Sequence, residues 1–189
     1  MSLIYRYVFP ENHAAERARA ILKRIKDVPN PLVAEIGVFA GALSTILLAA
    51  RPDLQLLMVD PYDTYEQSED YKATGDYHTT MSAGEHLLAR KRALWSTEFA
   101  WFRREVCLKP SVVAAKDYER QFDLVFIDGD HSYKGCKEDI LAWMPLVKLG
   151  GWLSGHDYRT DLDFGVKQAV DEMFPKAELD DNFTWFVRV

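Results

Sequence analysis

What this sequence contains little of excludes several classes of protein. Its 189 residues include two cysteines, Cys107 and Cys136, so disulfides cannot frame the fold and a reducing cytoplasm is the expected location. No apolar run approaches the roughly 18 residues of a membrane-spanning helix, and the first residues lack the apolar core of a signal peptide. The net charge is −6 without any block of like charges, whereas a nucleic-acid-binding face would be basic. We therefore expect a cytoplasmic protein with neither nucleic acid nor a membrane as its partner.

The remaining composition fits one globular domain over residues 1–189. Hydrophobic residues make up 48% of the chain and charged residues 28%, which allows a substantial core. Residues 1–31 are expected to form an N-terminal helical segment, because apolar side chains recur at helical spacing over residues 11–27 and two prolines follow. No repeat, low-complexity segment or linker divides the rest of the sequence.

The most informative stretch covers residues 32–48. An apolar run over residues 32–36 contains one acid, Glu35, and is followed by Gly37, Gly41 and an apolar stretch of helical length. This order predicts a buried strand, a tight turn and a helix whose free N–H groups can approach a ligand. The spacing of the two glycines lacks the G-x-G-x-x-G fingerprint of dinucleotide-binding proteins. An ordinary strand-to-helix turn with glycines that serve packing is the alternative.

The pattern Glu35-x-Gly37-x-x-x-Gly41 resembles motif I of class I S-adenosylmethionine-dependent methyltransferases. The resemblance implies that Glu35 lies near the ammonium of the cofactor and that the turn, with Phe39, lies under the cofactor. It further implies that Ser111, after the expected third strand, lies near the adenine.

Asp60 ends the second expected strand, residues 54–60, about 20 residues after the glycine turn. A carboxylate at this position can accept hydrogen bonds from both ribose hydroxyls of a nucleotide, because it offers two acceptor oxygens. A turn aspartate before Pro61 is the alternative.

Elsewhere the hydrophobic pattern alternates between strand and helix. Further strands are predicted at residues 99–103, 124–127, 149–154 and 183–189, and further helices at residues 82–94, 134–146 and 164–174, with Ser111 as the N-cap of a short helix. Residues 61–81 lack clear periodicity but are rich in tyrosine, which fits either a lid over a substrate or a solvated loop.

A second group of polar residues follows two later strands. Asp128, Asp130 and His131 come directly after one strand, and His156 and Asp157 follow the next. In an open parallel sheet, both groups lie at the carboxyl edge, where ligands bind. The carboxylates suit Mg²⁺, and His131 suits a general base near neutral pH.

The phrase Ile127-Asp-Gly-Asp-His-Ser-Tyr133, with Gly150-Gly151, the His156-Asp157-Tyr158 triplet and residues 165–169, resembles one branch of the class I methyltransferases. That branch contains small-molecule O-methyltransferases of the macrolide-sugar and cephalosporin type. The resemblance implies an α/β, doubly wound, mostly parallel Rossmann-like sheet with an antiparallel last strand. It also implies S-adenosylmethionine as methyl donor and often a divalent metal.

Carried onto this sequence, the branch implies that Asp128 is a metal ligand and His131, three residues later, the base. His156 and Asp157 match a pair of metal ligands whose first member is usually an acid. Imidazole suits Zn²⁺, Fe²⁺ or Mn²⁺ better than Mg²⁺, so the identity of the metal is open. In the alternative without a metal, Asp128 and Asp157 shape the cleft by hydrogen bonding. Asp130 is expected to cap the next helix.

We therefore predict a cytoplasmic S-adenosylmethionine-dependent methyltransferase that acts on a hydroxyl of a small molecule. Asp128 and His131 are the predicted catalytic residues, and a divalent cation such as Mg²⁺ or Mn²⁺ is held by Asp128, His156 and Asp157. Two alternatives are a nicotinamide-dependent oxidoreductase on a similar sheet and a catalytically silent domain that binds S-adenosylmethionine. The sequence leaves open the acceptor and whether the chain forms a homo-oligomer.

Overall fold

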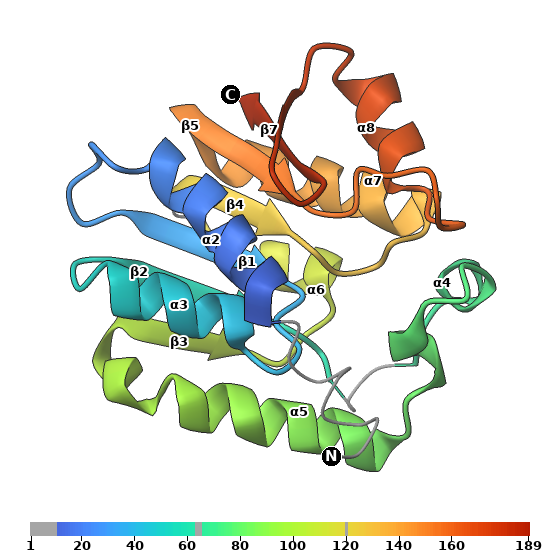
Figure 1. The fold of residues 1–189 in the computed structure, drawn as a ribbon, viewed down its shortest axis with the longest axis horizontal. Coiled ribbons are helices and arrows are strands. Elements are labelled where there is room, and N and C mark those ends of the chain that lie inside the picture. The colour runs from blue at the N-terminus through green and yellow to red at the C-terminus, as the bar shows by residue number, and fades with distance from the viewer. Residues whose placement is uncertain (1–10, 63–65, 120) are drawn as a thin grey trace.

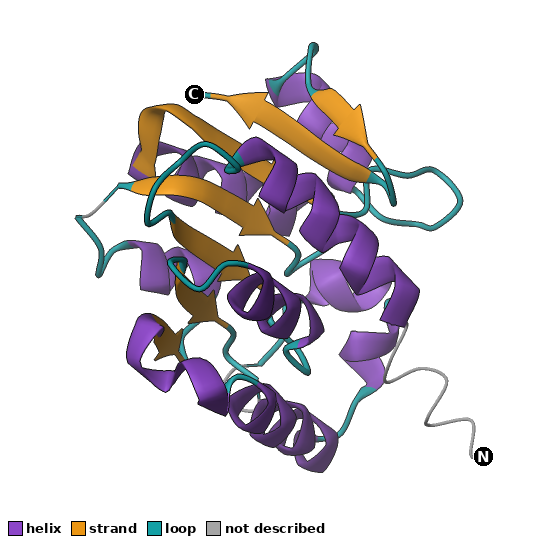
Figure 2. Ribbon diagram, turned by 60° about the vertical axis from the view of Figure 1, so that its left-hand side comes forward, coloured by secondary structure: helices purple, strands orange, loops and turns teal. Residues whose placement is uncertain are grey.

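The computed structural model describes residues 11–62, 66–119 and 121–189, which form one sheet with helices on both faces (Figures 1 and 2). The sheet has seven strands in the order β3-β2-β1-β4-β5-β7-β6. Neighbours from β3 to β5 in this order pair in parallel, whereas β7 is antiparallel to both β5 and β6. The prediction of a doubly wound, mostly parallel sheet with an antiparallel last strand is therefore confirmed.

The elements have the following bounds. The strands are β1 (Leu32–Ile36), β2 (Gln55–Val59), β3 (Arg104–Cys107), β4 (Phe122–Ile127), β5 (Val147–Gly155), β6 (Glu178–Asp180) and β7 (Thr184–Arg188). The helices are α2 (Glu11–Arg24), α3 (Ala42–Ala50), α4 (Glu69–Ala73), η1 (Tyr77–Thr80), α5 (Ala83–Ser96), η2 (Glu98–Arg103), α6 (Ser111–Ala115), α7 (Tyr133–Trp143), η3 (Met144–Leu146) and α8 (Val166–Met173). In the described part of the chain, none of these helices has the length and apolar character needed to cross a membrane.

Two hydrophobic clusters, one on each face of the sheet, form the core. Val33 and Leu56 belong to the cluster that contains residues of α2, α3 and α5. Their neighbours Ala34 and Leu57 belong to the cluster that contains residues of α6, α7 and α8. Since successive side chains of a strand point to opposite faces, central strands covered on both faces are apolar throughout. This burial explains the continuous apolar runs in the sequence.

The parallel strands of the sheet end at one level. Ile36 pairs with Val59 on one side and with Ile127 on the other, and Ile127 pairs with Gly155. The residues that follow these four strand ends are Gly37, Asp60, Asp128 and His156. The register of the sheet therefore brings both polar groups of the sequence to the same edge.

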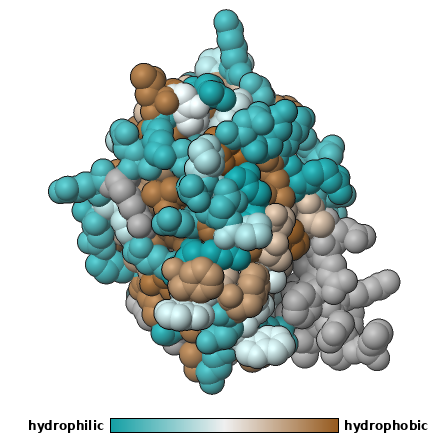
Figure 3. Space-filling view, turned by 90° about the vertical axis from the view of Figure 1, so that its left-hand side faces the viewer, coloured by the Kyte–Doolittle hydropathy of each residue, from teal (hydrophilic) through white to brown (hydrophobic). Residues whose placement is uncertain are grey.

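The parallel strands have their amino ends at the opposite end of the molecule. Figure 3 views the side at the left of Figure 1, toward which the amino ends of the strands point, and there hydrophilic residues cover more of the surface than apolar ones. The cavity described below lies at the other end, where the parallel strands have their carboxyl ends.

The prediction of a strand over residues 99–103 is wrong. These residues belong to η2, and the strand that pairs with β2 is the next segment, β3. Aromatic residues are common in strands, but Phe99, Trp101 and Phe102 are 52%, 68% and 69% exposed here. β3 is an edge strand of four residues, two of which are charged, so its own sequence carries a weaker strand signal.

Two capping predictions are also wrong. Pro110, not Ser111, is the residue before α6, and the Ser111 hydroxyl instead accepts a hydrogen bond from Trp143 Nε1 at 2.8 Å. The cap of α7 is Ser132, whereas Asp130 accepts the backbone N–H of Ser132 at 2.9 Å. Ser132 caps α7 through its side chain, whereas Pro110 makes no side-chain hydrogen bond to the end of α6. Ser111 and Asp130 make other contacts instead.

We expect Gly37→Ala to destabilise the fold by about 2–4 kcal/mol, because the position combines a φ of +87° with a Cβ that would overlap the carbonyl oxygen of Asp128. Gly84→Ala is the matched control, since Gly84 lies in α5 without close neighbours and alanine favours helix there by up to about 1 kcal/mol. Chemical denaturation measures both. Equal stability of the two variants would contradict the close approach of β1 and β4.

Candidate active site

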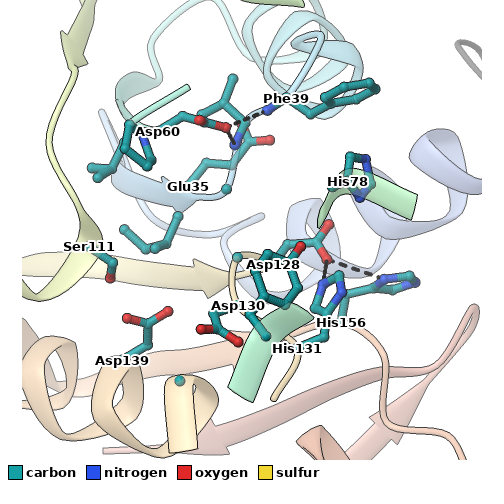
Figure 4. Close-up of a pocket in the computed structure, with 18 of the residues that line it drawn as sticks. Glu35, Phe39, Asp60, His78, Ser111, Asp128, Asp130, His131, Asp139 and His156 are labelled. Carbon is teal, nitrogen blue, oxygen red and sulfur yellow. Dashed lines mark hydrogen bonds and ion pairs between the residues drawn. The ribbon is translucent and has the colours of Figure 1, made fainter. Parts of the chain in front are cut away.

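One cavity of about 560 Å³ lies at the carboxyl edge of the sheet. Its walls come from α2, the glycine turn, the ends of β1, β2, β4 and β5, the first turns of α6 and α7, and residues between 67 and 78. The volume is within the roughly 300–1,000 Å³ of sites for small molecules and cofactors. Figure 4 shows that Glu35, Asp60 and Ser111 lie on one side of this cavity, and Asp128, His131 and His156 on the other.

Asp60 ties the glycine turn to the end of β2. Its Oδ2 accepts the backbone N–H groups of Val38 and Phe39 at 2.9 and 2.8 Å, and its Oδ1 accepts that of Tyr62 at 2.8 Å. A carboxylate has about four acceptor sites, so the backbone already occupies most of them. Asp60 therefore retains room for about one further hydroxyl rather than two.

The residues of the glycine turn are constrained by the backbone and side chains that pack against them. Gly41 has a φ of +76°, and a Cβ there would lie 2.7 Å from the Cα of Ala93 in α5. Phe39 also has a positive φ, of 50°, and its ring meets His78 edge to face at 4.6 Å. The packing of the turn explains these residues, and their predicted contact with a cofactor stays a prediction.

Glu35 is a buried acid at the end of β1. The Ser44 hydroxyl donates a hydrogen bond to its carboxyl group. Burial raises the pKa of Glu35 to about 8, against the opposing effect of this hydrogen bond. At neutral pH the side chain is mostly uncharged, and a cation placed beside it would favour ionisation.

A second buried acid, Asp139 on α7, lines the same cavity near Ser111. Burial raises the pKa of Asp139 to about 7, while a hydrogen bond with Ser111 lowers it. The sequence analysis missed this residue, since it lies mid-helix beside two other charged residues.

Three residues at the other side of the cavity can together hold a metal ion. One ligand atom each of Asp128, His131 and Asp157 lies within 4.8 Å of the others. His131 Nε2 is 3.2 Å from Asp157 Oδ2 and 3.4 Å from Asp128 Oδ1. This nitrogen is buried and has no hydrogen bond of good geometry in the described structure. The predicted base thus belongs to the group with metal-ligand spacing.

His156 lies beside this group with both ring nitrogens engaged. Its Nδ1 is 3.0 Å from Asp157 Oδ2 and 3.4 Å from Asp128 Oδ1. Its Nε2 is 2.9 Å from the side-chain oxygen of Asn182. His156 is therefore close enough to join a metal centre, but its role as a ligand stays a prediction.

Arg17 of α2 reaches into the same cluster, and the sequence analysis missed it. Its Nη1 donates to Asp128 Oδ2 at 3.1 Å and lies 3.3 Å from His156 Nδ1. Its Nε is buried and has no partner among the described residues. The helical spacing could have indicated that Arg17 faces the core. It is three residues from Ala14 and four from Ile21, which both lie on the buried face of the helix.

Asp76 is the other residue of the cluster that was missed. Its Oδ2 lies 2.5 Å from His131 Nδ1. It belongs to the segment that was predicted as a lid or solvated loop, of which residues 63–65 lie outside the described structure. The described part carries α4 and η1 and lines the cavity with Gln67, Ser68, Tyr71, Asp76 and His78. We call residues 66–81 the aromatic wall.

The charges of the cluster shift the pKa values of its members in opposite directions. Burial raises the pKa of Asp128, but the charges of Arg17 and His156 outweigh burial and bring it well below its usual range. Burial lowers the pKa of His131, but the carboxylates of Asp128 and Asp76 outweigh this and raise it well above its ordinary value. Burial lowers the pKa of His156, but the carboxylates of Asp128 and Asp157 outweigh this and raise it to about 9. Without a further cation, both imidazole rings of the cluster therefore favour their protonated forms beside the ionised Asp128.

Known proteins similar to this chain are methyltransferases. A family model described as a methyltransferase domain matches residues 34–158. No curated protein is significantly similar in sequence.

Solved structures show the same fold. The calicheamicin methyltransferase CalS11 is similar at 14% identity and a TM-score of 0.69, over 98% of this chain and 82% of that one. The O-methyltransferase NovP is similar at 16% identity and a TM-score of 0.63, over 92% and 79% of the chains. The N-methyltransferase NodS from Bradyrhizobium japonicum WM9, in complex with S-adenosyl-l-homocysteine, is similar at 14% identity and a TM-score of 0.59, over 93% and 87%.

Asp139→Asn tests the buried acid through the pH dependence of stability. With a folded pKa of about 7, wild-type Asp139 keeps a proton that the unfolded chain releases above pH 4, so its stability falls as the pH rises to 7. The neutral variant lacks this loss. Its free energy of unfolding should therefore rise by up to about 3 kcal/mol relative to that of wild type as the pH increases from 4.5 to 8. Urea denaturation across this range measures the difference. Asp70→Asn, on the exposed side of α4, is the control, and a variant that tracks wild type at every pH contradicts the assignment.

Proposed function

Because this chain belongs to the family of methyltransferase domains, it is an S-adenosylmethionine-dependent methyltransferase, and we propose that its acceptor is a hydroxyl group of a small molecule. The observation that carries the proposal is the single cavity at the carboxyl edge. It joins the residues predicted for the cofactor, at the ends of β1 and β2, to the cluster of Asp128, His131 and Asp157. A methyl donor on one side would thus face a base on the other.

The residues of the first side fit S-adenosylmethionine. Glu35, buried and mostly neutral, gains a partner when an ammonium group lies beside it. Asp60 can accept one ribose hydroxyl, and we assign the adenine to the part of the cavity lined by Ser111 and Asp139. When bound, S-adenosylmethionine supplies a methyl group on a sulfonium sulfur, which is transferred to the acceptor oxygen as the carbon–sulfur bond breaks.

His131 is the proposed general base, with Nε2 as the atom that takes the proton of the acceptor hydroxyl. The surrounding carboxylates favour the protonated form of His131 in the free protein. The ring therefore becomes neutral, and able to accept a proton, only when the charge of these carboxylates is compensated. Asp128 and Asp157 have the ligand chemistry to bind a divalent cation at this position. Such an ion would offset both carboxylates and lower the pKa of a hydroxyl bound to it.

The choice of metal depends on the groups around these carboxylates. His156 presents Nδ1 to the carboxylates of the cluster, and imidazole favours Mn²⁺, Fe²⁺ or Zn²⁺ over Mg²⁺. Arg17 already pairs with Asp128, so a metal ion has to compete with this guanidinium. We therefore propose a borderline transition-metal ion rather than Mg²⁺ as the preferred cation.

The similar proteins named as O-methyltransferases support a hydroxyl acceptor. The calicheamicin enzyme among them supports a small molecule as the acceptor class. We further propose that the acceptor contacts the aromatic wall, because this segment lines the cavity and its tyrosine suits either a sugar or a phenol. The family match leaves the nicotinamide alternative without support, whereas a silent cofactor-binding domain remains the rival to test.

Binding of S-adenosylhomocysteine should release a proton below pH 8. Glu35 has a pKa of about 8 in the free protein, and the ligand's ammonium favours its ionised form, so affinity rises with pH up to about 8 and then levels off. Calorimetry in buffers of different protonation enthalpy measures the release. Glu35→Gln should abolish it and weaken binding about 10- to 100-fold, the worth of one charge-assisted hydrogen bond.

The matched control for this titration is Glu69→Gln, an exposed acid on α4. It should leave both affinity and proton release unchanged. Equal behaviour of Glu35→Gln and wild type would remove Glu35 from the cofactor site.

Methyl transfer is tested with methyl-labelled S-adenosylmethionine against phenols, catechols, and free and nucleotide-linked sugars. We expect labelled product, loss of activity after chelation and recovery with Mn²⁺. His131→Gln should lower the rate about 10²- to 10⁴-fold, the usual contribution of a general base, while S-adenosylhomocysteine still binds. Cofactor binding without product from any acceptor would favour the silent domain. Activity that survives chelation would overturn the metal and leave the carboxylates as hydrogen-bonding groups.

A further inference from the structure

Asp76 gives the proposed base a partner from outside the strand ends. Its Oδ2 lies 2.5 Å from His131 Nδ1, and the two residues are 55 positions apart in the sequence. Both side chains are buried, with 5% of Asp76 and 9% of His131 exposed. A buried carboxylate this close to an imidazole nitrogen constrains the ring strongly.

The contact fixes which ring nitrogen carries a proton. Donors surround the Asp76 carboxylate, because its Oδ1 accepts the backbone N–H of His78 at 2.8 Å and its Oδ2 accepts the Tyr71 hydroxyl at 3.3 Å. An ionised carboxylate only accepts hydrogen bonds, so His131 Nδ1 is the donor. The other nitrogen, Nε2, then faces Asp128 and Asp157.

Neighbouring rings hold the same orientation. Phe164 lies over the His131 ring at 4.7 Å between centroids and 31° between planes. Tyr71 meets the ring edge to face at 6.0 Å. Rotation of the imidazole would therefore disturb two aromatic contacts as well as the hydrogen bond to Asp76.

The two oxygens of Asp76 serve separate purposes. Oδ1 accepts the backbone N–H of His78 at 2.8 Å, which begins η1, and it also lies 2.9 Å from Nδ1 of the His78 ring. Oδ2 faces His131 and also accepts the Tyr71 hydroxyl at 3.3 Å. An isosteric amide can preserve the first contact while removing the charge that the imidazole uses.

We propose that Asp76 is a positioning residue for the base, which holds the His131 ring with Nδ1 protonated and Nε2 turned toward the acceptor. The inference rests on the proposed function, because it assigns an orientation to the base named there. Since Asp76 belongs to the aromatic wall, the base is complete only when this wall lies against the strand ends. The same carboxylate stabilises the imidazolium that forms when the ring takes the acceptor's proton.

The test is nitrogen-15 NMR of histidine-labelled protein saturated with S-adenosylhomocysteine, which needs no acceptor. Wild type should show His131 protonated at Nδ1, with a strongly downfield ring proton that Asp76→Asn loses. Asp70→Asn is the matched control, because Asp70 is an exposed acid of the same wall, and it should keep the signal. His131→Gln assigns the signal among the five histidines.

Kinetics supply the second readout, with an acceptor identified by the methyl-transfer screen. Asp76→Asn should lower kcat about 10²- to 10⁴-fold, as expected when a base loses the group that orients it. KM and the affinity for S-adenosylhomocysteine should stay within about two-fold of wild type, because the substitution affects the chemical step rather than binding.

A wild-type spectrum with His131 protonated only at Nε2 would overturn the inference, even if Asp76→Asn does not fold. An unchanged kcat in a folded Asp76→Asn protein would overturn it as well. Failure of the wild type to bind S-adenosylhomocysteine would instead overturn the proposed function, so the two failures are distinguishable.

Discussion

The burial of two carboxylates at neighbouring strand ends is the constraint that arranges this site. Asp128 and Asp157 are largely removed from water, and an uncompensated buried charge costs several kcal/mol. The compensating groups come from elsewhere in the chain: Arg17 from α2 and the rings of His131 and His156. The need to balance these charges thus links α2, which packs on one face of the sheet, to the carboxyl edge through Arg17.

The sequence predicts those site residues that lie at the ends of strands. Glu35, Asp60 and Asp128 each follow or end an apolar strand, and parallel strands end at one edge, so their proximity follows from the fold class. Arg17 and Asp76 depend on how α2 and the aromatic wall dock, which no spacing in the sequence encodes. Helical periodicity would have placed Arg17 on the buried face, but not beside Asp128.

The errors in the fold have a related cause. Residues 99–103 have the composition of a strand, yet they form η2, because pairing with β2 is taken by the next segment and not by the most apolar one. Serine and aspartate often cap helices. Here, however, Ser111 accepts a hydrogen bond from Trp143, and Asp130 accepts one from the backbone N–H of Ser132. The type of a residue limits the contacts that its side chain can make, and its neighbours in the folded structure determine which of those contacts form.

The cavity is built by two kinds of structure, and this has an evolutionary consequence. The side proposed for the cofactor consists of strand ends and a glycine turn, whose φ angles and close contacts leave little freedom for substitution. The side proposed for the acceptor includes the aromatic wall, whose elements α4 and η1 contribute fewer buried residues to the core than the strands do. New acceptors can thus be acquired by divergence of one short segment, provided that each new version still presents a carboxylate to His131.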